Sequence, residues 1–334
     1  MDDTRLNETQ FADLTSRYRR ELQIHCYRML GSYEESEDLV QETFLRAWRR
    51  LETYEGRSTF RAWLYRIATN ACLDTLAKRP EKKIATGPAP TDETASTVPA
   101  VAVPWLQPFP DISPDDEPDA VVVSRETIEL AFLTAIQHLP ARQRAALILR
   151  DVVGWPAKDT AGALDCTVAT ANSLLQRARD TMRAQLPKRR LEWAPTTAPT
   201  AEELAVVARY MKAIEDADDK AIGELLAEDA RCAQAPWTGG NMSDDPVWYE
   251  GNLVDAWAPV LHGPDRLEFR IVPVSANLMP GIACYVRPPG ATEFEAFGLD
   301  LLRVVDGRIA EFTCFGNETF AFFGLPTKTT HPGQ

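Results

Sequence analysis

Short polar side chains at helical spacing between residues 167 and 183 have the chemistry that reading DNA requires. One face of this segment carries Thr170, Ser173, Gln176, Arg177 and Asp180, and the opposite face carries Val168, Ala171, Leu175, Ala178 and Met182, at about 100° per residue. Hydroxyl and amide groups exchange hydrogen bonds with base edges in the major groove, and guanidinium groups hold phosphates. The segment is therefore predicted to be a DNA-recognition helix.

The residues before this helix predict the support that a helix-turn-helix needs. Pro140 suits the first turn of a helix, because the N–H that proline lacks would have no partner there, and Gly154 ends that helix. Pro156 begins a short second helix that runs to Leu164, and Thr167 is placed to cap the recognition helix. The alternative, from periodicity alone, is an ordinary amphipathic helix hairpin.

A second surface is predicted on a helix over residues 36–51. Its apolar face holds Val40, Phe44, Ala47 and Leu51, and the opposite face carries Asp38, Gln41, Glu42, Leu45 and Arg49. A leucine among acids and amides favours a protein-binding surface. The alternative is a solvated helix face with one stray leucine.

Residues 54–79 combine a Gly-Arg-Ser-Thr loop with a helix that carries aromatic and basic side chains. The packing face is predicted to hold Trp63, Leu64, Ile67, Ala68 and Ala71, and the polar positions are Arg61, Arg66, Asn70, Asp74, Lys78 and Arg79. Aromatic and basic groups beside a flexible polar loop suit single-stranded or melting DNA, because stacking, cation contacts and hydrogen bonds to base edges can hold a base that has left the duplex. Trp63 itself is expected to belong to the core.

Composition indicates a globular protein of two or three domains, with 334 residues, 45% of them apolar, and a net charge of −13. The charge is uneven along the chain. Residues 124–198 carry 11 basic and 7 acidic side chains, whereas residues 199–334 carry 10 and 21. The resulting +4 on the helix-turn-helix is modest for binding that depends on phosphate neutralisation, so this protein is expected to need help to hold DNA.

Targeting signals and metal-binding patterns are not evident. No apolar run is long enough to span a bilayer and no signal-peptide pattern is seen, so a cytoplasmic location is expected. The six cysteines show neither CxxC pairing nor metal-ligand spacing with the four histidines. His25 beside Cys26 is expected to be structural, and no metal or cofactor is predicted.

Pattern and composition divide the chain into four parts: a helical segment at residues 8–80, a linker at 81–123, the helix-turn-helix region at 124–190 and a further domain at 200–325. The linker is inferred because residues 80–118 contain nine prolines and no convincing periodicity. Within it, Trp105, Leu106 and Phe109 are costly to leave in water. They are expected to dock on a folded surface.

The last domain is predicted to be α+β. Two helices, at about residues 201–217 and 219–227, precede strand-like runs at 267–274, 281–287, 294–305 and 308–315. Asp306 and Gly307 between two of these runs are a strong hairpin signal. Helices followed by a strand meander indicate a curved antiparallel sheet.

Two stretches of the chain resemble the extracytoplasmic-function (ECF) sigma factors of the sigma-70 family. GSYEESEDLVQETFLRAWRRLETYEGRSTFRAWLYRIATNACLDTLAKR resembles their region 2, and LPARQRAALILRDVVGW followed by the helix-turn-helix resembles their region 4, over roughly residues 10–186. The resemblance implies two all-α sigma domains, a region 2 helical bundle and a region 4 helix-turn-helix. It also implies promoter-specific transcription initiation, with promoter DNA and core RNA polymerase as partners, the latter through its β′ clamp helices and β flap.

The resemblance also implies roles for named residues. Core-polymerase binding falls on Asp38, Leu39, Gln41, Glu42 and Leu45. Recognition and opening of the minus-ten element fall on Arg57, Ser58, Thr59, Arg61, Arg66, Asn70, Asp74, Lys78 and Arg79. Contact with the minus-thirty-five element falls on Thr167, Thr170, Asn172, Ser173, Gln176, Arg177 and Arg179. This sequence departs from the usual region 4 pattern at Thr160, Ala171 and Asn172, which weakens the transfer of minus-thirty-five specificity.

Residues 200–325 resemble the SnoaL-like branch of the nuclear-transport-factor-like fold, an α+β cone, through WYEG, the DGR hairpin and the closing FGLP. Related domains include isomerases and cyclases that use an Asp or His in an apolar pocket. Asp300, between Leu299 and Leu301, is the candidate for such a role; the alternatives are that it pairs with Arg303 or faces solvent.

No acid-base partner for Asp300 can be assigned, so a regulatory domain that is not an enzyme is favoured, and a small ligand stays open. The acidic domain is expected to pack on the sigma domains through the aromatic part of the linker and to modulate them. Two other functions compete with this interpretation. One is a stand-alone ligand-responsive helix-turn-helix regulator, and the other is a SnoaL-like isomerase or cyclase fused to a DNA-binding module.

Overall fold

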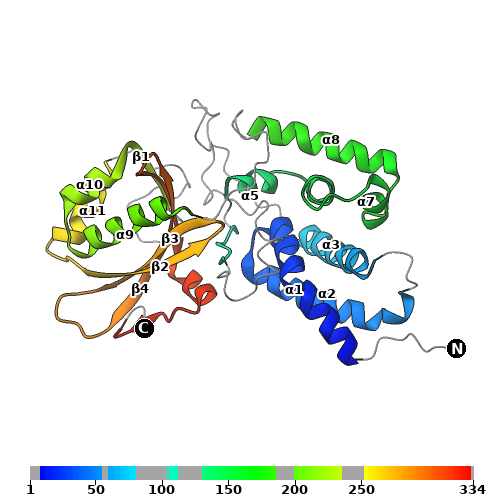
Figure 1. Cartoon of the computed structure of the whole chain (residues 1–334), viewed down its shortest axis with the longest axis horizontal. Helices are drawn as coiled ribbons and strands as arrows, with labels where there is room; N and C mark the ends of the chain where they lie inside the picture. Colours follow the sequence, from blue (N-terminus) through cyan, green and yellow to red (C-terminus); the bar gives the residue numbers. More distant parts are fainter. Residues whose placement is uncertain are drawn as a thin grey trace.

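The computed structural model describes residues 8–54, 59–79, 103, 105–111, 130–185, 199–234 and 252–331. Helices from the first half of the chain lie at one end of the molecule and a sheet domain lies at the other (Figure 1). Residues 105–111 run between these two ends. The linker is therefore part of the packed structure and not only a connection along the sequence.

The N-terminal bundle contains α1 (Glu8–Leu30), α2 (Tyr33–Arg49), the short 3-10 helix η1 (Leu51–Thr53) and α3 (Phe60–Lys78). Ser32 caps α2 by accepting a hydrogen bond from the N–H of Glu35, and Thr59 caps α3 by accepting one from Ala62. Such caps satisfy N–H groups that have no partner within the helix. The two caps fix where the functional helices begin.

The second helical body contains α5 (Leu130–Gln137), α6 (Ala141–Leu147), a π-helical turn η3 (Ile148–Val152), α7 (Ala157–Ala163) and α8 (Val168–Gln185). Pro140 and Pro156 occupy the cap positions of α6 and α7. Gly154 has a φ of +77°, and Asp165 has a φ of +46° in the turn before α8. The predicted helix-turn-helix is confirmed.

The packing face of α8 differs from the prediction at one position. Ala171, Leu175, Ala178 and Met182 are buried as expected, but Val168 is 42% exposed. Val168 is the first residue of α8, which leaves its side chain at the rim of the packed face. Periodicity alone does not account for such end effects.

The C-terminal domain begins with α9 (Ala201–Glu215) and α10 (Asp219–Leu225), and continues with β1 (Leu226–Gln234), α11 (Leu253–His262), β2 (Glu268–Ala276), β3 (Met279–Arg287), β4 (Phe294–Val305), β5 (Arg308–Gly316), η5 (Asn317–Phe323) and β6 (Lys328–Thr329). The sheet order is β1-β5-β4-β3-β2, with β6 paired to β4. Asp306 and Gly307 have φ values of +49° and +73°, as the predicted hairpin requires. The α+β prediction is confirmed.

Two features of this domain were not predicted. The sheet is not wholly antiparallel, because β1 pairs with β5 in parallel. In addition, the helix α11 lies between β1 and β2 in the sequence. The sequence of β1, LAEDARCAQ, lacks strict apolar alternation, and α11 contains Pro259. Strand alternation therefore does not predict β1, and the proline within α11 counts against a helix there.

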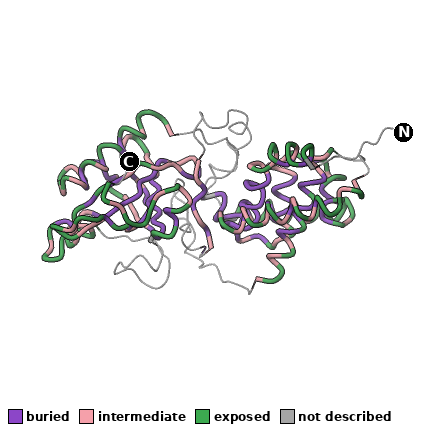
Figure 2. Tube along the Cα trace, turned by 90° about the horizontal axis from the view of Figure 1, so that it is seen from below, coloured by how far each residue is buried: buried purple, intermediate pink, exposed green. Residues whose placement is uncertain are grey.

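The sheet has two differently covered faces. One belongs to a core cluster with α9, α10 and α11, which includes Tyr210, Ile222, Leu261 and Phe312. The other, which includes Tyr285, belongs to the same core cluster as the linker and the helical bodies. Buried residues accordingly fill the helical end and the sheet, as Figure 2 shows.

Candidate functional site

The exposed face of α2 presents an apolar patch within an acidic surface. Asp38 and Gln41 are exposed, Leu39 and Glu42 are half-buried, and Leu45 is 52% exposed. Trp48, one turn beyond Leu45 and 43% exposed, extends the apolar part. Sequence reasoning missed Trp48, although its spacing of three residues from Leu45 is the signal that could have found it.

The outward face of α3 forms a polar row. Arg66, Asn70, Asp74 and Lys78 are all exposed, while Trp63 is buried in the core as expected. The carboxylate of Asp74 lies 3.0 Å from the guanidinium of Arg46 on α2. This ion pair ties the polar row of α3 to the helix that carries the apolar patch.

Two of the arginines that the sequence assigns to the minus-ten site form ion pairs within the bundle. Arg61 donates to the Glu21 carboxylate from Nε at 2.6 Å, and Arg79 contacts the carboxylate of Glu35. Arg79 also donates to the carbonyl of Leu30 at 3.3 Å. Thr59 is exposed and caps α3, whereas Arg57 and Ser58 lie outside the described residues. Arg61 and Arg79, at the two ends of α3, are thus each held by a carboxylate of the bundle.

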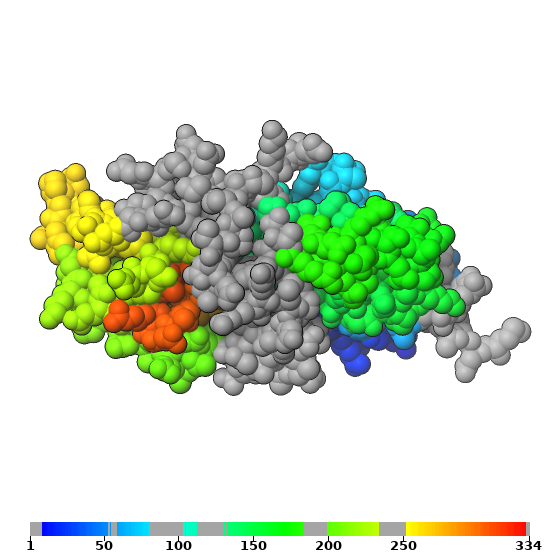
Figure 3. Space-filling model, turned by 90° about the horizontal axis from the view of Figure 1, so that it is seen from above, coloured from blue at the N-terminus to red at the C-terminus, as the bar shows by residue number. Residues whose placement is uncertain are grey.

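The outward face of α8 is open along its length. Thr167, Thr170, Asn172, Ser173, Gln176, Arg177 and Arg179 are exposed. Thr167 Oγ1 accepts from the N–H of Thr170 at 3.1 Å, which caps the helix. Two side chains of this face bind carboxylates: the Arg179 guanidinium donates to both carboxylate oxygens of Asp151, at 2.8 and 2.6 Å, and Gln176 donates to Asp180 at 3.1 Å. Figure 3 shows residues 130–185, in green, as a continuous outer surface of the helical end.

A buried arginine joins the two helical bodies. Arg144 on α6 donates to the carbonyls of Gln137 and Leu139 at 2.9 and 3.1 Å, and reaches across to the carbonyl of Met29 on α1. Burial lowers its pKa to about 9. Nearby, the rings of Tyr65 and Trp155 lie 5.6 Å apart across the same junction. Arg144 also donates to the side-chain oxygen of Gln137 at 2.6 Å. Sequence reasoning did not identify Arg144, because most of its partners are backbone carbonyls.

The aromatic part of the linker packs between α1, α2 and the β2–β3 hairpin. Leu106 is 6% exposed and Phe109 is fully buried, whereas Trp105 is half-buried and donates to Gln137 at 3.3 Å. The Phe109 ring lies 4.7 Å from the Tyr27 ring, and the Arg20 guanidinium lies 4.1 Å from its centroid. All three linker residues therefore contact folded surfaces.

The hairpin tip supplies polar contacts to the linker. Asn277 accepts from the N–H of Phe109 at 2.9 Å and donates to the hydroxyl of Tyr27 at 3.1 Å. The Tyr27 hydroxyl in turn donates to the carbonyl of Gln107 at 2.6 Å. The Asp111 carboxylate accepts from Ser275 at 2.5 Å, and burial raises the pKa of this carboxyl. One amide side chain thus contacts both the linker and the N-terminal bundle.

Asp300 is buried within the C-terminal sheet. It is 6% exposed, and burial raises the pKa of its carboxyl to about 6. The expected alternatives of a solvent-facing Asp300 or a pair with Arg303 are both wrong, because Arg303 binds Glu311 at 2.7 Å. The thiol of Cys314 is the hydrogen-bond partner that lowers this pKa in part.

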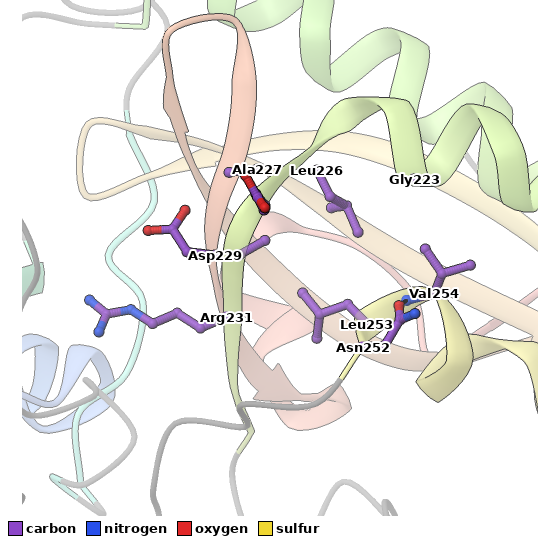
Figure 4. Close-up of a pocket in the computed structure, with 10 residues that line it drawn as sticks. Gly223, Leu226, Ala227, Asp229, Arg231, Asn252, Leu253 and Val254 are labelled. Atoms are coloured by element: carbon purple, nitrogen blue, oxygen red, sulfur yellow. Dashed lines mark hydrogen bonds between the residues drawn. The ribbon is translucent and has the colours of Figure 1, made fainter.

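An open pocket of about 730 Å³ lies between the start of β1 and the start of α11. In Figure 4 Leu226, Leu253 and Val254 lie on one side of β1, while Asp229 and Arg231 point away on the other side. Asp300 does not line this pocket. Within the described ranges no group of three or more His, Cys, Asp or Glu side chains could hold a metal ion.

Comparisons with known proteins identify the family to which the chain is similar. The Sigma-70 region 2 family matches residues 14–80, and the Sigma-70 region 4 family matches residues 129–182. The chain is 38% identical over 326 residues to the ECF RNA polymerase sigma factor SigG of Mycobacterium tuberculosis, covering 95% of this chain and 84% of the relative. It is 29% identical to the ECF RNA polymerase sigma factor SigW of Bacillus subtilis over 54% of this chain and 90% of the relative.

A solved structure also has the same overall fold. The crystal structure of the Mycobacterium tuberculosis ECF sigma factor SigJ covers 95% of this chain and 99% of its own, with a TM-score of 0.58 and 21% identity. That likeness shows that the arrangement of helical bodies and sheet domain occurs in another chain. Among the helices described for this protein, none has both the length and the apolar character to cross a bilayer.

Proposed function

The chain belongs to the ECF sigma factors. From that membership we propose which part of the chain performs each step of promoter-specific transcription initiation. Sigma factors act with core RNA polymerase and promoter DNA. The proposed parts are residues 8–80 for polymerase and the minus-ten element, 81–123 as linker, 124–190 for the minus-thirty-five element, and 200–325 as regulatory domain. The observation that carries this proposal is the relation to SigG over 95% of the chain.

The α2 face, with Asp38, Leu39, Gln41, Glu42 and Leu45, is proposed to bind the β′ clamp helices of the polymerase. Support comes from Leu45 and Trp48, which leave apolar surface in water beside carboxylates that could pair with a basic partner. Exposed apolar side chains flanked by charge are common in protein interfaces. The β flap is the corresponding proposed partner of the region 4 body.

The two DNA elements are assigned to α3 and α8. On α3 the exposed row of Arg66, Asn70, Asp74 and Lys78 is proposed to contact the minus-ten element, with Thr59 and the adjoining loop. On α8 the exposed hydroxyl, amide and guanidinium groups are proposed to contact the minus-thirty-five element. Arg61, Arg79 and Arg179 would each have to leave a carboxylate before they could contact DNA.

Reconstitution with core RNA polymerase tests the proposal. Leu45→Asp should reduce promoter-dependent transcription about tenfold or more, because a charge replaces the centre of an apolar contact. Leu204→Asp is the matched control, since Leu204 is 50% exposed on α9, outside the proposed polymerase surface. Equal activity of the two variants, or equally tight promoter binding without polymerase, would overturn the assignment.

The C-terminal domain is proposed to modulate initiation through the linker contacts. Asn277 joins the domain to both Phe109 and Tyr27, so Asn277→Ala should loosen the domain without touching polymerase or DNA surfaces. Promoter-dependent transcription by the full-length variant should differ from that of the wild type, either as an increase or as a decrease. Glu295→Gln, which alters only an exposed ion pair with Lys328, is the control. Identical transcription by all three proteins would remove the proposed coupling.

A catalytic role for the C-terminal domain is not favoured. Asp300 has a raised pKa, as a general base requires, but it does not line the open pocket, and Cys314 is its hydrogen-bond partner. We therefore propose that this domain is regulatory and is not an enzyme. Whether it also binds a small ligand is left open by this proposal. The place of action proposed is the cytoplasm, where the polymerase of the related sigma factors works.

A further inference from the structure

Two thiols and a carboxylate form a row across three adjacent strands of the C-terminal sheet. The Sγ atoms of Cys232 on β1 and Cys314 on β5 are 3.5 Å apart. Cys314 lies opposite Asp300 of β4 in the register, and the Cys314 thiol is hydrogen-bonded to the Asp300 carboxylate. The row thus leads from the outermost strand of the sheet to a buried acceptor.

The members of this row differ in exposure. Cys232 is half-buried on β1, which lies at one end of the strand order, whereas Cys314 and Asp300 are 5% and 6% exposed. A small reagent from solvent therefore meets Cys232 first. The hydrogen bond to Cys232, together with burial, raises the pKa of the Cys314 thiol well above its usual value, so Cys314 retains its proton until a sulfur electrophile forms beside it.

We propose that Cys232 and Cys314 form a dithiol site that hydrogen peroxide converts to a disulfide. The Cys232 thiolate attacks a peroxide oxygen, the O–O bond breaks, and the products are a sulfenic acid and, after protonation, water. The Cys314 sulfur then attacks the sulfenic sulfur, the S–O bond breaks, and hydroxide leaves as a second water. Asp300 accepts the proton that Cys314 loses and passes it to the departing hydroxide, which completes the second water. In sum, two thiols and one peroxide give one disulfide and two waters.

The sheet geometry says which part must move. Cys232 lies opposite Phe312 and Cys314 lies opposite Gln234, so the new bond runs diagonally between the parallel strands. The two sulfurs must close from 3.5 Å to about 2.05 Å, and their backbones must approach accordingly. β1 can take up this shift because, among the described strands, it pairs with β5 alone, and its register is irregular between Leu226 and Arg231.

A second thiol pair provides an internal control. Cys26 and Cys72 in the N-terminal bundle are hydrogen-bonded to each other, but both are fully buried. If closeness alone governed oxidation, both pairs would react. If access through Cys232 is required, only the pair in the sheet reacts while the protein stays folded.

The test uses the reduced full-length protein with one to five equivalents of hydrogen peroxide, quenched with catalase. Thiols counted in denaturant should fall from six to four, and mapping without reductant should find Cys232 linked to Cys314. Cys314→Ser should leave a sulfenic acid on Cys232 that dimedone traps, and Cys232→Ser should form no disulfide. Cys72→Ser, as control, should still lose two thiols.

Three results would overturn the proposal: a wild-type count that stays at six, a crosslink that maps to Cys26 and Cys72, or equal thiol loss in Cys232→Ser. The proton role of Asp300 has its own readout. Asp300→Asn should slow disulfide closure about tenfold or more while sulfenic acid persists, because the proton acceptor is gone. An unchanged closure rate in a variant with wild-type circular dichroism would show that Asp300 is not the acceptor.

Discussion

Arg144 shows how one buried charge can hold two helical bodies together. Its guanidinium donates to carbonyls on both sides of the junction, a geometry that lysine cannot reproduce. Because carbonyls would be left without donors, we expect Arg144→Lys to cost about 3 kcal/mol of stability. A thermal melt monitored by far-ultraviolet circular dichroism measures this, with the exposed Arg177→Lys as control. Equal melting temperatures for the two variants would contradict the role assigned to Arg144.

His25 predicts an acid-sensitive N-terminal bundle. Burial, with the nearby Arg28 and Arg61, lowers its pKa to about 3, and its Nε2 lies 3.0 Å from the Thr69 hydroxyl. Between pH 3 and about 6.5 the unfolded chain therefore binds a proton that the folded chain excludes. The stability contribution of His25 is complete above pH 6.5 and declines by about 1.4 kcal/mol for each pH unit below it.

Urea unfolding at pH 7.5, 6.5, 6 and 5 measures that effect. The wild-type unfolding free energy should fall more steeply with acidity than that of His25→Gln, which has no titrating ring. The difference in slope should approach one proton between pH 6 and 5. Parallel pH dependences would show that His25 titrates alike in the folded and unfolded states.

At the scale of elements, one close contact between strands is decisive for the C-terminal domain. A Cβ on Gly281 of β3 would lie 2.8 Å from the Asp300 carbonyl oxygen and 2.7 Å from a Leu301 methyl group. We expect Gly281→Ala to destabilise the domain by about 1 to 3 kcal/mol, because strand β4 must move. Gly223→Ala in α10 is the control: its Cβ would lie 3.6 Å from Val254, an ordinary contact, and alanine suits a helix. Similar denaturation midpoints for both variants would refute the argument.

Elements fixed by local chemistry could be predicted from the sequence, and elements fixed by distant partners could not. Asp306 and Gly307 identify their hairpin because the turn needs positive φ, and the spacing of Ala171, Leu175 and Ala178 identifies α8. β1 was missed because its pairing with β5 involves residues about 80 positions away. For the same reason the polar faces of α2 and α3 were predictable, but the ion pairs that hold Arg61 and Arg79 were not.

At the scale of the whole molecule, one hydrophobic core runs through the N-terminal bundle, the linker and one face of the sheet. Sequence reasoning placed aromatic linker residues on some folded surface, but it could not identify that surface. Tyr27 and Asn277 are 250 positions apart in the sequence, so no local sequence pattern predicts their contact. The fold therefore couples a domain of net negative charge to the DNA-binding bodies through a few specific groups.

Phe109 is the residue on which this coupling can be measured. Its ring is fully buried against Tyr27 and Arg20. Phe109→Ala should therefore weaken the contact between the bundle and the C-terminal domain by about 3 to 5 kcal/mol, and so release the domain from the bundle. Small-angle X-ray scattering should then show a larger radius of gyration, while the helix content stays unchanged. Phe297→Ala, which removes a ring packed within the C-terminal domain alone, is the control and should leave the radius at its wild-type value. If Phe109→Ala kept the wild-type scattering curve, the linker would not be what holds the two ends of the molecule together.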